Sequence, residues 1–214
     1  MPERHLSPVD RLIGGIDSAL RTLAAGDVAA ARPSPAAGVK ENPLSRREVA
    51  HSAGLMRVNH AGEIAAQGLY QGHAAVARNK DIEQQMNAAA DEELDHLDWC
   101  RERLTELGSR PSWLSPLWYA GAFAIGAASG VLGDRWSLGF IAETEKQVSE
   151  HLAGHLDTLP RQDARSRAIV RQMREEEEHH GANAERAGAE ALPRAVRDLM
   201  RLSARIMTRT AYWI

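Results

Sequence analysis

No part of this chain alternates apolar and polar residues with the two-residue period of a strand. Long stretches are instead rich in Ala, Leu, Glu, Gln and Arg, which favour helices, and β-branched residues are sparse. Gly and Pro residues mark where these stretches end. The pattern therefore predicts an all-α protein.

The breaks divide the chain into long helices with short connections. Asn79–Lys80 and Pro160 mark two turns, while Gly108 and Pro111 end the second long helix. The predicted elements are a short amphipathic helix over 10–25, a Pro-rich linker over 32–44, four long helices over about 45–79, 81–107, 135–159 and 163–191, and a last helix that Pro193 opens. Residues 1–44 are thus expected to form an appendage, and residues 45–214 a single helical domain.

Composition narrows the classes of function. A length of 214 residues with 43% hydrophobic content suits one globular domain. The net charge of -3 gives no general basic field, so nucleic acid is not an expected partner. The lone Cys100 excludes an internal disulfide framework, and the N-terminus has no apolar stretch typical of a secretory signal. Cytosolic placement is the starting expectation.

Carboxylates and histidines repeat at matched distances in the long helices. Glu63 is followed 30 residues later by Glu93, and Glu145 is followed 31 residues later by Glu176. A histidine stands three residues after the second glutamate of each pair, and residues at this spacing share a helix face. These histidines are His96 and His179.

The two turns give this repeat a geometric meaning. Each lies about midway between the two glutamates of its pair, so in an antiparallel hairpin these glutamates lie level. Two such hairpins packed face to face bring together four carboxylates and two imidazoles, the ligand set of di-iron carboxylate bundles. Oxygen and nitrogen ligands favour iron or manganese, and two divalent cations would offset the buried negative charge. The predicted ligands are Glu63, Glu93, His96, Glu145, Glu176 and His179, with Glu93 and Glu176 as the bridges.

A simpler interpretation exists for each part. A single Glu-x-x-His in a charged helix is usually a solvated face, and several other acidic residues flank both copies. Only the spacing of three selects Glu93 and Glu176 from these runs. His151 and His60 are candidates for hydrogen-bonding a metal ligand rather than for binding metal.

Two further segments indicate contact with lipid. Residues 113–132 carry no charge and would be long enough to span a bilayer, but a crossing there would separate the two halves of the metal site. The segment is therefore expected to re-enter, to lie along the interface or to pack as a cross-over beside the bundle; burial within a dimer is the alternative. The last helix, 194–214, combines apolar residues with a basic stripe suited to anionic lipid, although an ordinary terminal helix would look similar. The stripe consists of Arg194, Arg197, Arg201, Arg205 and Arg209.

Four sequence elements together resemble a known family. RVNHAGE at 57–63, ELDH at 93–96, ETEKQVSEH at 143–151 and EEEEHH at 175–180 are similar to segments of the demethoxyubiquinone hydroxylases of ubiquinone biosynthesis. The resemblance runs from about Ser45 to the C-terminus and implies a ferritin-like four-helix bundle. The same six residues fall on the family's iron ligands. Leu152 departs from the pattern, because members commonly have tyrosine there.

The resemblance also implies an activity. It is a membrane-peripheral di-iron monooxygenase that hydroxylates a polyprenyl demethoxyubiquinol with O2, on the cytoplasmic face of the inner membrane. No G-x-G-x-x-G element follows a strand, so the electrons are expected from a partner, from the quinol or from NADH bound elsewhere. A homo-oligomer and other ubiquinone-biosynthesis proteins are candidate partners. Iron oxidation and storage on a ferritin-like bundle, or a metal-free helical membrane adaptor, are the competing functions.

Overall fold

A computed structural model describes residues 17, 19, 20, 22, 23 and 30–214 of the chain. Within these residues the chain forms six helices and no strand, so the all-α prediction is confirmed. The helix expected over 10–25 falls mostly outside the described residues. The helices are α2 (Arg46–Val76), α3 (Lys80–Glu106), α4 (Ser115–Val131), α5 (Asp134–Thr158), α6 (Ala164–Arg186) and α7 (Arg194–Ala211).

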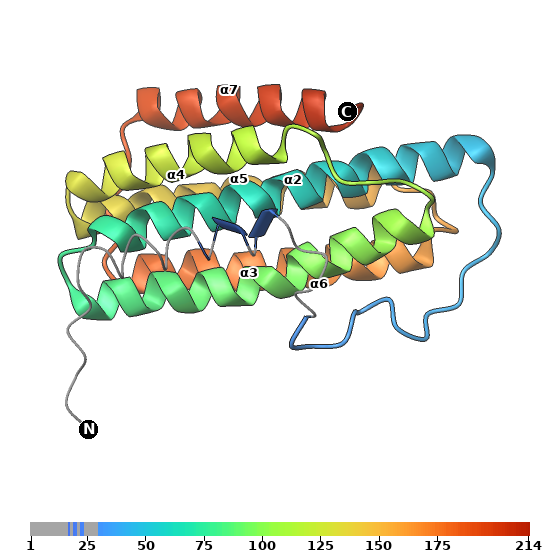
Figure 1. The fold of residues 1–214 in the computed structure, drawn as a ribbon, viewed down its shortest axis with the longest axis horizontal. Coiled ribbons are helices and arrows are strands. Elements are labelled where there is room, and N and C mark those ends of the chain that lie inside the picture. The colour runs from blue at the N-terminus through green and yellow to red at the C-terminus, as the bar shows by residue number, and fades with distance from the viewer. Residues whose placement is uncertain (1–16, 18, 21, 24–29) are drawn as a thin grey trace.

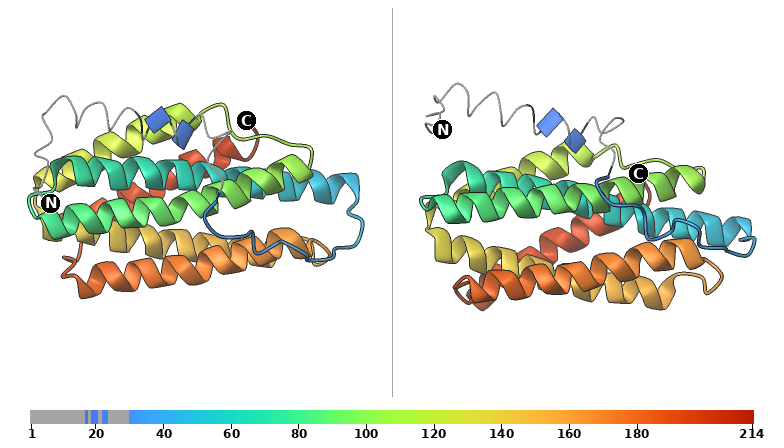
Figure 2. Two further views of the ribbon diagram at one scale, coloured as in Figure 1. Left: turned by 60° about the horizontal axis from the view of Figure 1, so that its bottom comes forward. Right: turned by 90° about the horizontal axis from the view of Figure 1, so that it is seen from below.

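Four of these helices form a bundle of two antiparallel hairpins (Figures 1 and 2). The first hairpin is α2–α3 and the second is α5–α6, as the two predicted turns require. The hairpins pack face to face, with α3 against α6 and α2 against α5. This arrangement brings the middle of all four helices to the same level along the bundle.

The helix ends follow from capping residues. Ser45 and Glu48 form a reciprocal capping box at the start of α2, and the Asn79 and Asp163 side chains cap α3 and α6. The helix predicted over 163–191 ends earlier than expected, at Arg186. Gly188 follows with a φ of 98°, a left-handed conformation that favours glycine and ends a helix.

The uncharged segment folds as the shorter helix α4, which lies along α2 (Figure 1). Three glycines allow the two backbones to approach closely, because a Cβ atom at Gly68, Gly72 or Gly126 would collide with backbone atoms of the facing helix. The segment therefore packs beside the bundle, one of the expected arrangements. Among the described residues, no helix has both the length and the apolar content needed to cross a bilayer.

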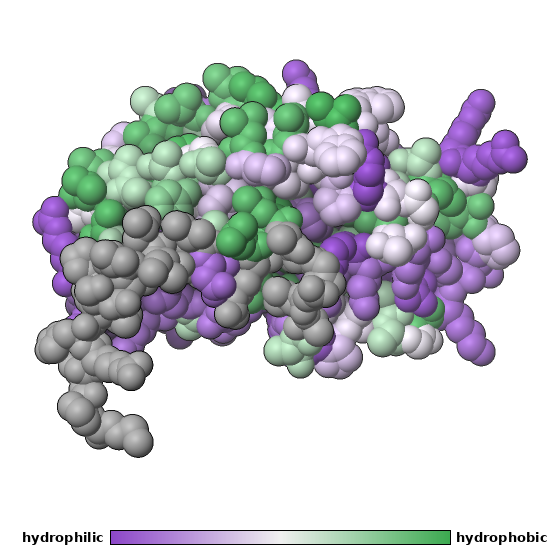
Figure 3. Space-filling view, viewed as in Figure 1, coloured by the Kyte–Doolittle hydropathy of each residue, from purple (hydrophilic) through white to green (hydrophobic). Residues whose placement is uncertain are grey.

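Helix α7 also rests against α2 but buries little of its own surface. Ala211 is its one buried residue, whereas Leu199, Leu202 and Ile206 are exposed. Figure 3 shows apolar side chains gathered along the same side of the molecule, over α4 and α7. This surface is formed by Trp113, Leu117, Ile125, Val131, Leu132, Leu199, Leu202, Ile206, Trp213 and Ile214; it is called the α4–α7 apolar surface below.

The segment 30–44 crosses the opposite side of the bundle, over α3 and α6 (Figure 2). Ala36 is buried in the same apolar cluster as Trp99 of α3 and Met173 of α6. Leu152, which replaces the tyrosine common in the resembled family, is buried in this cluster too. At this position the chain therefore has an apolar side chain that packs in the core, and not a polar group.

Candidate metal centre

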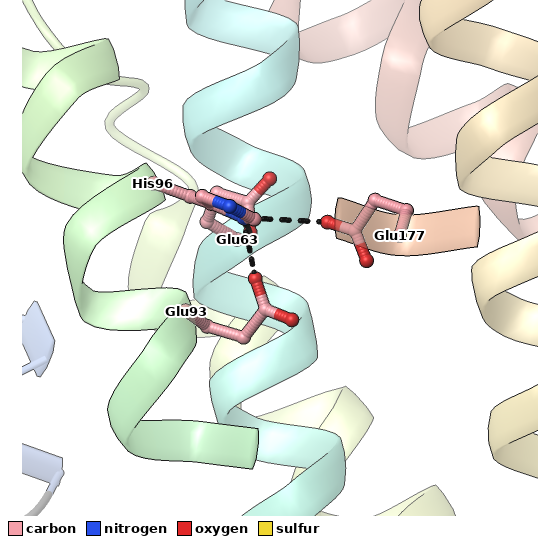
Figure 4. Close-up of side chains that lie close together, drawn as sticks. All are labelled: Glu63, Glu93, His96 and Glu177. Atoms are coloured by element: carbon pink, nitrogen blue, oxygen red, sulfur yellow. Dashed lines mark ion pairs between the residues drawn. The ribbon is translucent and has the colours of Figure 1, made fainter. Parts of the chain in front are cut away.

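Three helices bring four ligand-type side chains together in the middle of the bundle (Figure 4). Each of the four offers an atom, and these atoms all lie within 4.8 Å of one another. All four side chains are buried. They are Glu63 of α2, Glu93 and His96 of α3, and Glu177 of α6.

His96 turns one ring nitrogen into this group. Its Nδ1 lies 2.8 Å from Oε2 of Glu93, 3.4 Å from Oε1 of Glu177 and 3.8 Å from Oε2 of Glu63. Its Nε2 points away from the group, toward α6. A metal ion bound by the three carboxylates would therefore meet Nδ1 and not Nε2.

The group continues toward α5 and the next turn of α6. Nδ1 of His180 lies 3.1 Å from Oε1 of Glu93 and 3.4 Å from Oε2 of Glu177. Glu145 of α5 is buried beside Glu177, and the hydroxyl of Tyr70 donates a hydrogen bond to it. Glu93 and Glu177 thus lie between two halves, one completed by Glu63 and His96 and the other by Glu145 and His180.

The structure differs from the sequence prediction in the acidic run of α6. Glu176 and His179 were expected to face the interior, but His179 is exposed and the side chain of Glu176 is 19% exposed at the rim. Glu177 and His180 are buried in their place. Both pairs have the same spacing of three, so spacing alone could not choose between them; a shift of one residue turns the helix by about 100°.

Protons offset part of the buried negative charge. Burial raises the pKa of Glu63 well above its usual value, and the charge of Glu93 adds to this effect. Burial similarly raises the pKa of Glu145. Burial opposes the charging of His180, but the nearby carboxylates of Glu177 and Glu93 outweigh burial and raise the pKa of His180 to about 12. The pKa of His96 is also raised, so the two imidazolium ions offset carboxylates that a metal would otherwise neutralise.

The polar atoms of the group fit a bound cation. Both oxygens of Glu93, Oε2 of Glu177 and the Nδ1 atoms of His96 and His180 are buried. They lie within ion-pair distance of one another, yet none has a hydrogen-bond partner of normal geometry among the described residues. Buried polar atoms normally find partners, and oxygen and imidazole atoms that converge in this way are suited to divalent transition metals.

The other candidate histidines lie apart from the group. His151 is half-buried on α5 and packs its ring against His155, with 4.0 Å between the ring centroids. His60 is buried on α2, and burial lowers its pKa to about 3. Neither hydrogen-bonds one of the buried carboxylates within the described part of the chain, so the structure gives no support to their expected role.

Tyr70 is a residue of the site that the sequence prediction missed. It stands seven residues after Glu63, which is two helical turns, so both side chains point to the same face of α2. Its hydroxyl is buried against Glu145. The seven-residue spacing from a predicted ligand was the signal that could have identified it.

Comparison with known proteins identifies related sequences along nearly the whole chain. The family described as "Ubiquinone biosynthesis protein COQ7" matches residues 50–211. A protein of Ralstonia pickettii is 55% identical, covering 96% of this chain and 100% of the relative, and one of Bordetella pertussis is 55% identical, covering 99% and 95%. A protein of Nitrosococcus oceani is 51% identical over the full length of both chains. All three relatives are named 3-demethoxyubiquinol 3-hydroxylase.

Proposed function

This chain belongs to the COQ7 family of ubiquinone biosynthesis proteins, and from that premise we propose that it is a di-iron 3-demethoxyubiquinol 3-hydroxylase. The observation that carries the proposal is a buried group of carboxylates and imidazoles inside a chain that matches such hydroxylases over almost its entire length. Its substrate is the ring of a polyprenyl quinol. Iron storage and a metal-free adaptor role are not favoured, because the relatives are named as hydroxylases.

Two iron ions would be held in the two halves of the buried group. Glu93 and Glu177 would contribute to both halves, because each approaches both imidazoles. One half adds Glu63 and Nδ1 of His96, and the other adds Glu145 and Nδ1 of His180. This ligand set matches that of ferritin-like di-iron carboxylate bundles, with one Glu from each of two helices and Glu-x-x-His from the other two.

Bound iron would supply the chemistry to reduce O2 with two electrons and two protons from a reductant, so that one oxygen atom enters the quinol ring and the other leaves as water. The side chains of the protein position the ligand groups and exclude water from the site. Glu63 and Glu145, whose pKa values burial raises, would have to lose their protons in order to bind metal. Tyr70 holds Glu145 in place through its hydroxyl hydrogen bond, and the burial of all four carboxylates keeps bulk water from the reacting atoms.

The quinone content of cells tests this function directly. Cells that lack the gene are expected to accumulate demethoxyubiquinone and to lose ubiquinone, as measured by chromatography of lipid extracts. The wild-type gene should restore ubiquinone, whereas Glu63→Ala should not, because it removes a buried ligand. A gene with Glu178→Ala, which changes an exposed glutamate, serves as the control and should restore it. Normal ubiquinone in the deletion strain would contradict the proposed activity.

The substrate dissolves in lipid, and we propose that the α4–α7 apolar surface rests on the cytoplasmic face of the membrane. Leu199, Leu202 and Ile206 project from α7 on one side, and the arginines at 194, 205 and 209 are exposed along the flank of the same helix. Apolar side chains beside basic ones are typical of helices that lie in the interface of anionic membranes. Peripheral attachment of this kind needs no membrane-spanning helix.

Binding to lipid vesicles tests the attachment. Replacing Leu199, Leu202 and Ile206 by glutamine is expected to weaken binding to anionic vesicles at least about tenfold, because each aliphatic side chain contributes about 1.5–3 kcal/mol when fully buried. Cosedimentation measures the bound fraction, which high salt should also reduce by screening the arginines. Ser203→Gln on the same helix is the control. Unchanged cosedimentation of the triple variant would show that α7 is an ordinary terminal helix.

A further inference from the structure

Each metal-binding motif contains a second glutamate immediately before the inward-facing one. The sequences read Glu92-Glu93-x-x-His96 in α3 and Glu176-Glu177-x-x-His180 in α6. Glu93 and Glu177 face the buried group, and the preceding residues, turned by about 100°, lie at its rim. The proposed function assigns no role to these two outer carboxylates.

The outer carboxylates contact the histidines in a crossed pattern. Oε2 of Glu176 in α6 lies 2.6 Å from Nε2 of His96 in α3. Oε2 of Glu92 in α3 lies 2.8 Å from Nε2 of His180 in α6. Each glutamate therefore contacts the imidazole of the opposite helix. In both cases the contacted nitrogen is Nε2, which points away from the buried group.

We propose that Glu92 and Glu176 are positioning residues, which accept the Nε2–H of His180 and His96 and so direct the Nδ1 atoms toward the metal ions. The proposal rests on the proposed function. A carboxylate that accepts the second ring N–H of a metal-binding histidine fixes the orientation and tautomer of the ring and makes the ligating nitrogen more basic. Because the contacts cross between α3 and α6, they also fix the separation of the two hairpins at the height of the metals.

The two halves are not equivalent, because Arg32 of the segment 30–44 reinforces only one of them. Its guanidinium forms a bidentate ion pair with Glu176. Nη1 lies 2.5 Å from Oε1, and Nη2 lies 3.0 Å from Oε2. Nε2 of Gln172 donates to Oε1 of Glu176 as well, at 2.6 Å. Glu92 is by contrast 62% exposed. The His96 half is therefore held more firmly than the His180 half.

Arg32 is itself fixed to α3. Its Nε donates to Oδ2 of Asp95 at 2.5 Å, its guanidinium carbon lies 5.0 Å from the centre of the Trp99 ring, and its carbonyl oxygen accepts from the Trp99 indole. The neighbouring Ala31 N–H donates to Oδ1 of Asp95 at 2.7 Å. The segment 30–44 thereby acts as a strap that links Glu176 of α6 to α3 outside the metal site.

Titration of the purified metal-free chain with Co2+ under anaerobic conditions tests these roles, with the visible absorption of bound Co2+ as a report on ligand geometry. Glu176→Gln is expected to weaken binding of one of the two ions by about 10–100-fold and to shift the Co2+ bands. Arg32→Met should weaken the same ion less strongly, and Arg32→Lys should restore part of the loss. Glu92→Gln should affect the other ion, by less than about tenfold, because this carboxylate is mostly solvated.

Matched controls separate positioning from general loss of charge. Glu175→Gln neutralises the exposed neighbour of Glu176, and Arg171→Met removes an exposed arginine of α6. Both should titrate like the wild type. Thermal unfolding of each metal-free variant checks that the fold is retained, and a variant that binds weakly with an unchanged unfolding temperature supports the proposal.

The sign of the Arg32→Met effect distinguishes two roles of Glu176. If Glu176 were itself a metal ligand, Arg32 would compete with the metal for its carboxylate, and Arg32→Met would tighten binding. Tighter binding, or wild-type affinity and spectra for both Glu176→Gln and Arg32→Met, would overturn the positioning role while the wild-type chain still binds two ions. A wild-type chain that binds no Co2+ would instead refute the metal site of the proposed function.

Discussion

Glu177→Ala is expected to lower hydroxylation of demethoxyubiquinol more than about 100-fold, since even residues that only orient a metal ligand cost 10–100-fold when changed. Glu177 approaches His96 with one oxygen and His180 with the other, so its loss disrupts both halves of the site. Iron content per chain, measured on the purified protein, should fall together with the activity. The assay requires quinol, O2 and a supplied reductant.

His179→Ala is the informative companion to Glu177→Ala. The two residues lie in the same acidic run of α6, but His179 is exposed, so its replacement should leave iron content and activity close to wild type. Glu178→Ala gives a second control with the same chemical change as Glu177→Ala. If His179→Ala lost iron while Glu177→Ala retained it, the ligands would be Glu176 and His179, and the arrangement of α6 described above would be wrong.

Gly72→Ala is expected to destabilise the protein by about 1–3 kcal/mol, the usual cost of forcing an extra methyl group into a packed interior. Its Cβ would lie 2.9 Å from the amide nitrogen of Ala127, and closer still to the Phe123 carbonyl oxygen. Both atoms belong to the backbone of α4, which cannot rotate away as a side chain could. Thermal unfolding should show a decrease of about 2–4 °C for each kcal/mol in a chain of this size.

Gly154→Ala provides the matched comparison. Gly154 also lies inside a helix, but it is exposed and a Cβ there would meet nothing within 4 Å. Alanine should therefore stabilise α5 by about 0.5–1 kcal/mol, because glycine loses more conformational freedom on folding. Equal effects at both positions would mean that α4 does not pack against α2 at the distance described.

The sequence predicted the two hairpins because their turns are marked by local chemistry. Asn79 caps α3, and Pro160 interrupts the chain between α5 and α6, so matched distances from these turns predicted one height for Glu63, Glu93 and Glu145, which are all buried in the structure. Such distances tolerate an error of one residue. Which side chain is buried, however, changes completely when the helix position shifts by one residue. The sequence therefore could not choose between Glu176 and Glu177 in a run of four glutamates.

The contacts made by glycines and by Arg32 could not be predicted from local patterns. The glycines of α2 give no local signal of a contact, and only the course of α4 along them explains their role. Arg32 stands in a Pro-rich stretch that predicted a linker, 144 residues away from the glutamate it binds. Contacts of this kind depend on how distant segments fold back, which periodicity and capping do not record.

The attachment of both α4 and α7 to α2 sets the length of the route into the site. Helix α2 carries Glu63 on its inner face, while its outer side supports the two helices of the α4–α7 apolar surface. One helix is about 10 Å across. Under the proposed function, a quinol ring that arrives from the bilayer would therefore travel only a short distance to the buried carboxylate and imidazole group, while its polyprenyl tail stays dissolved among the lipids.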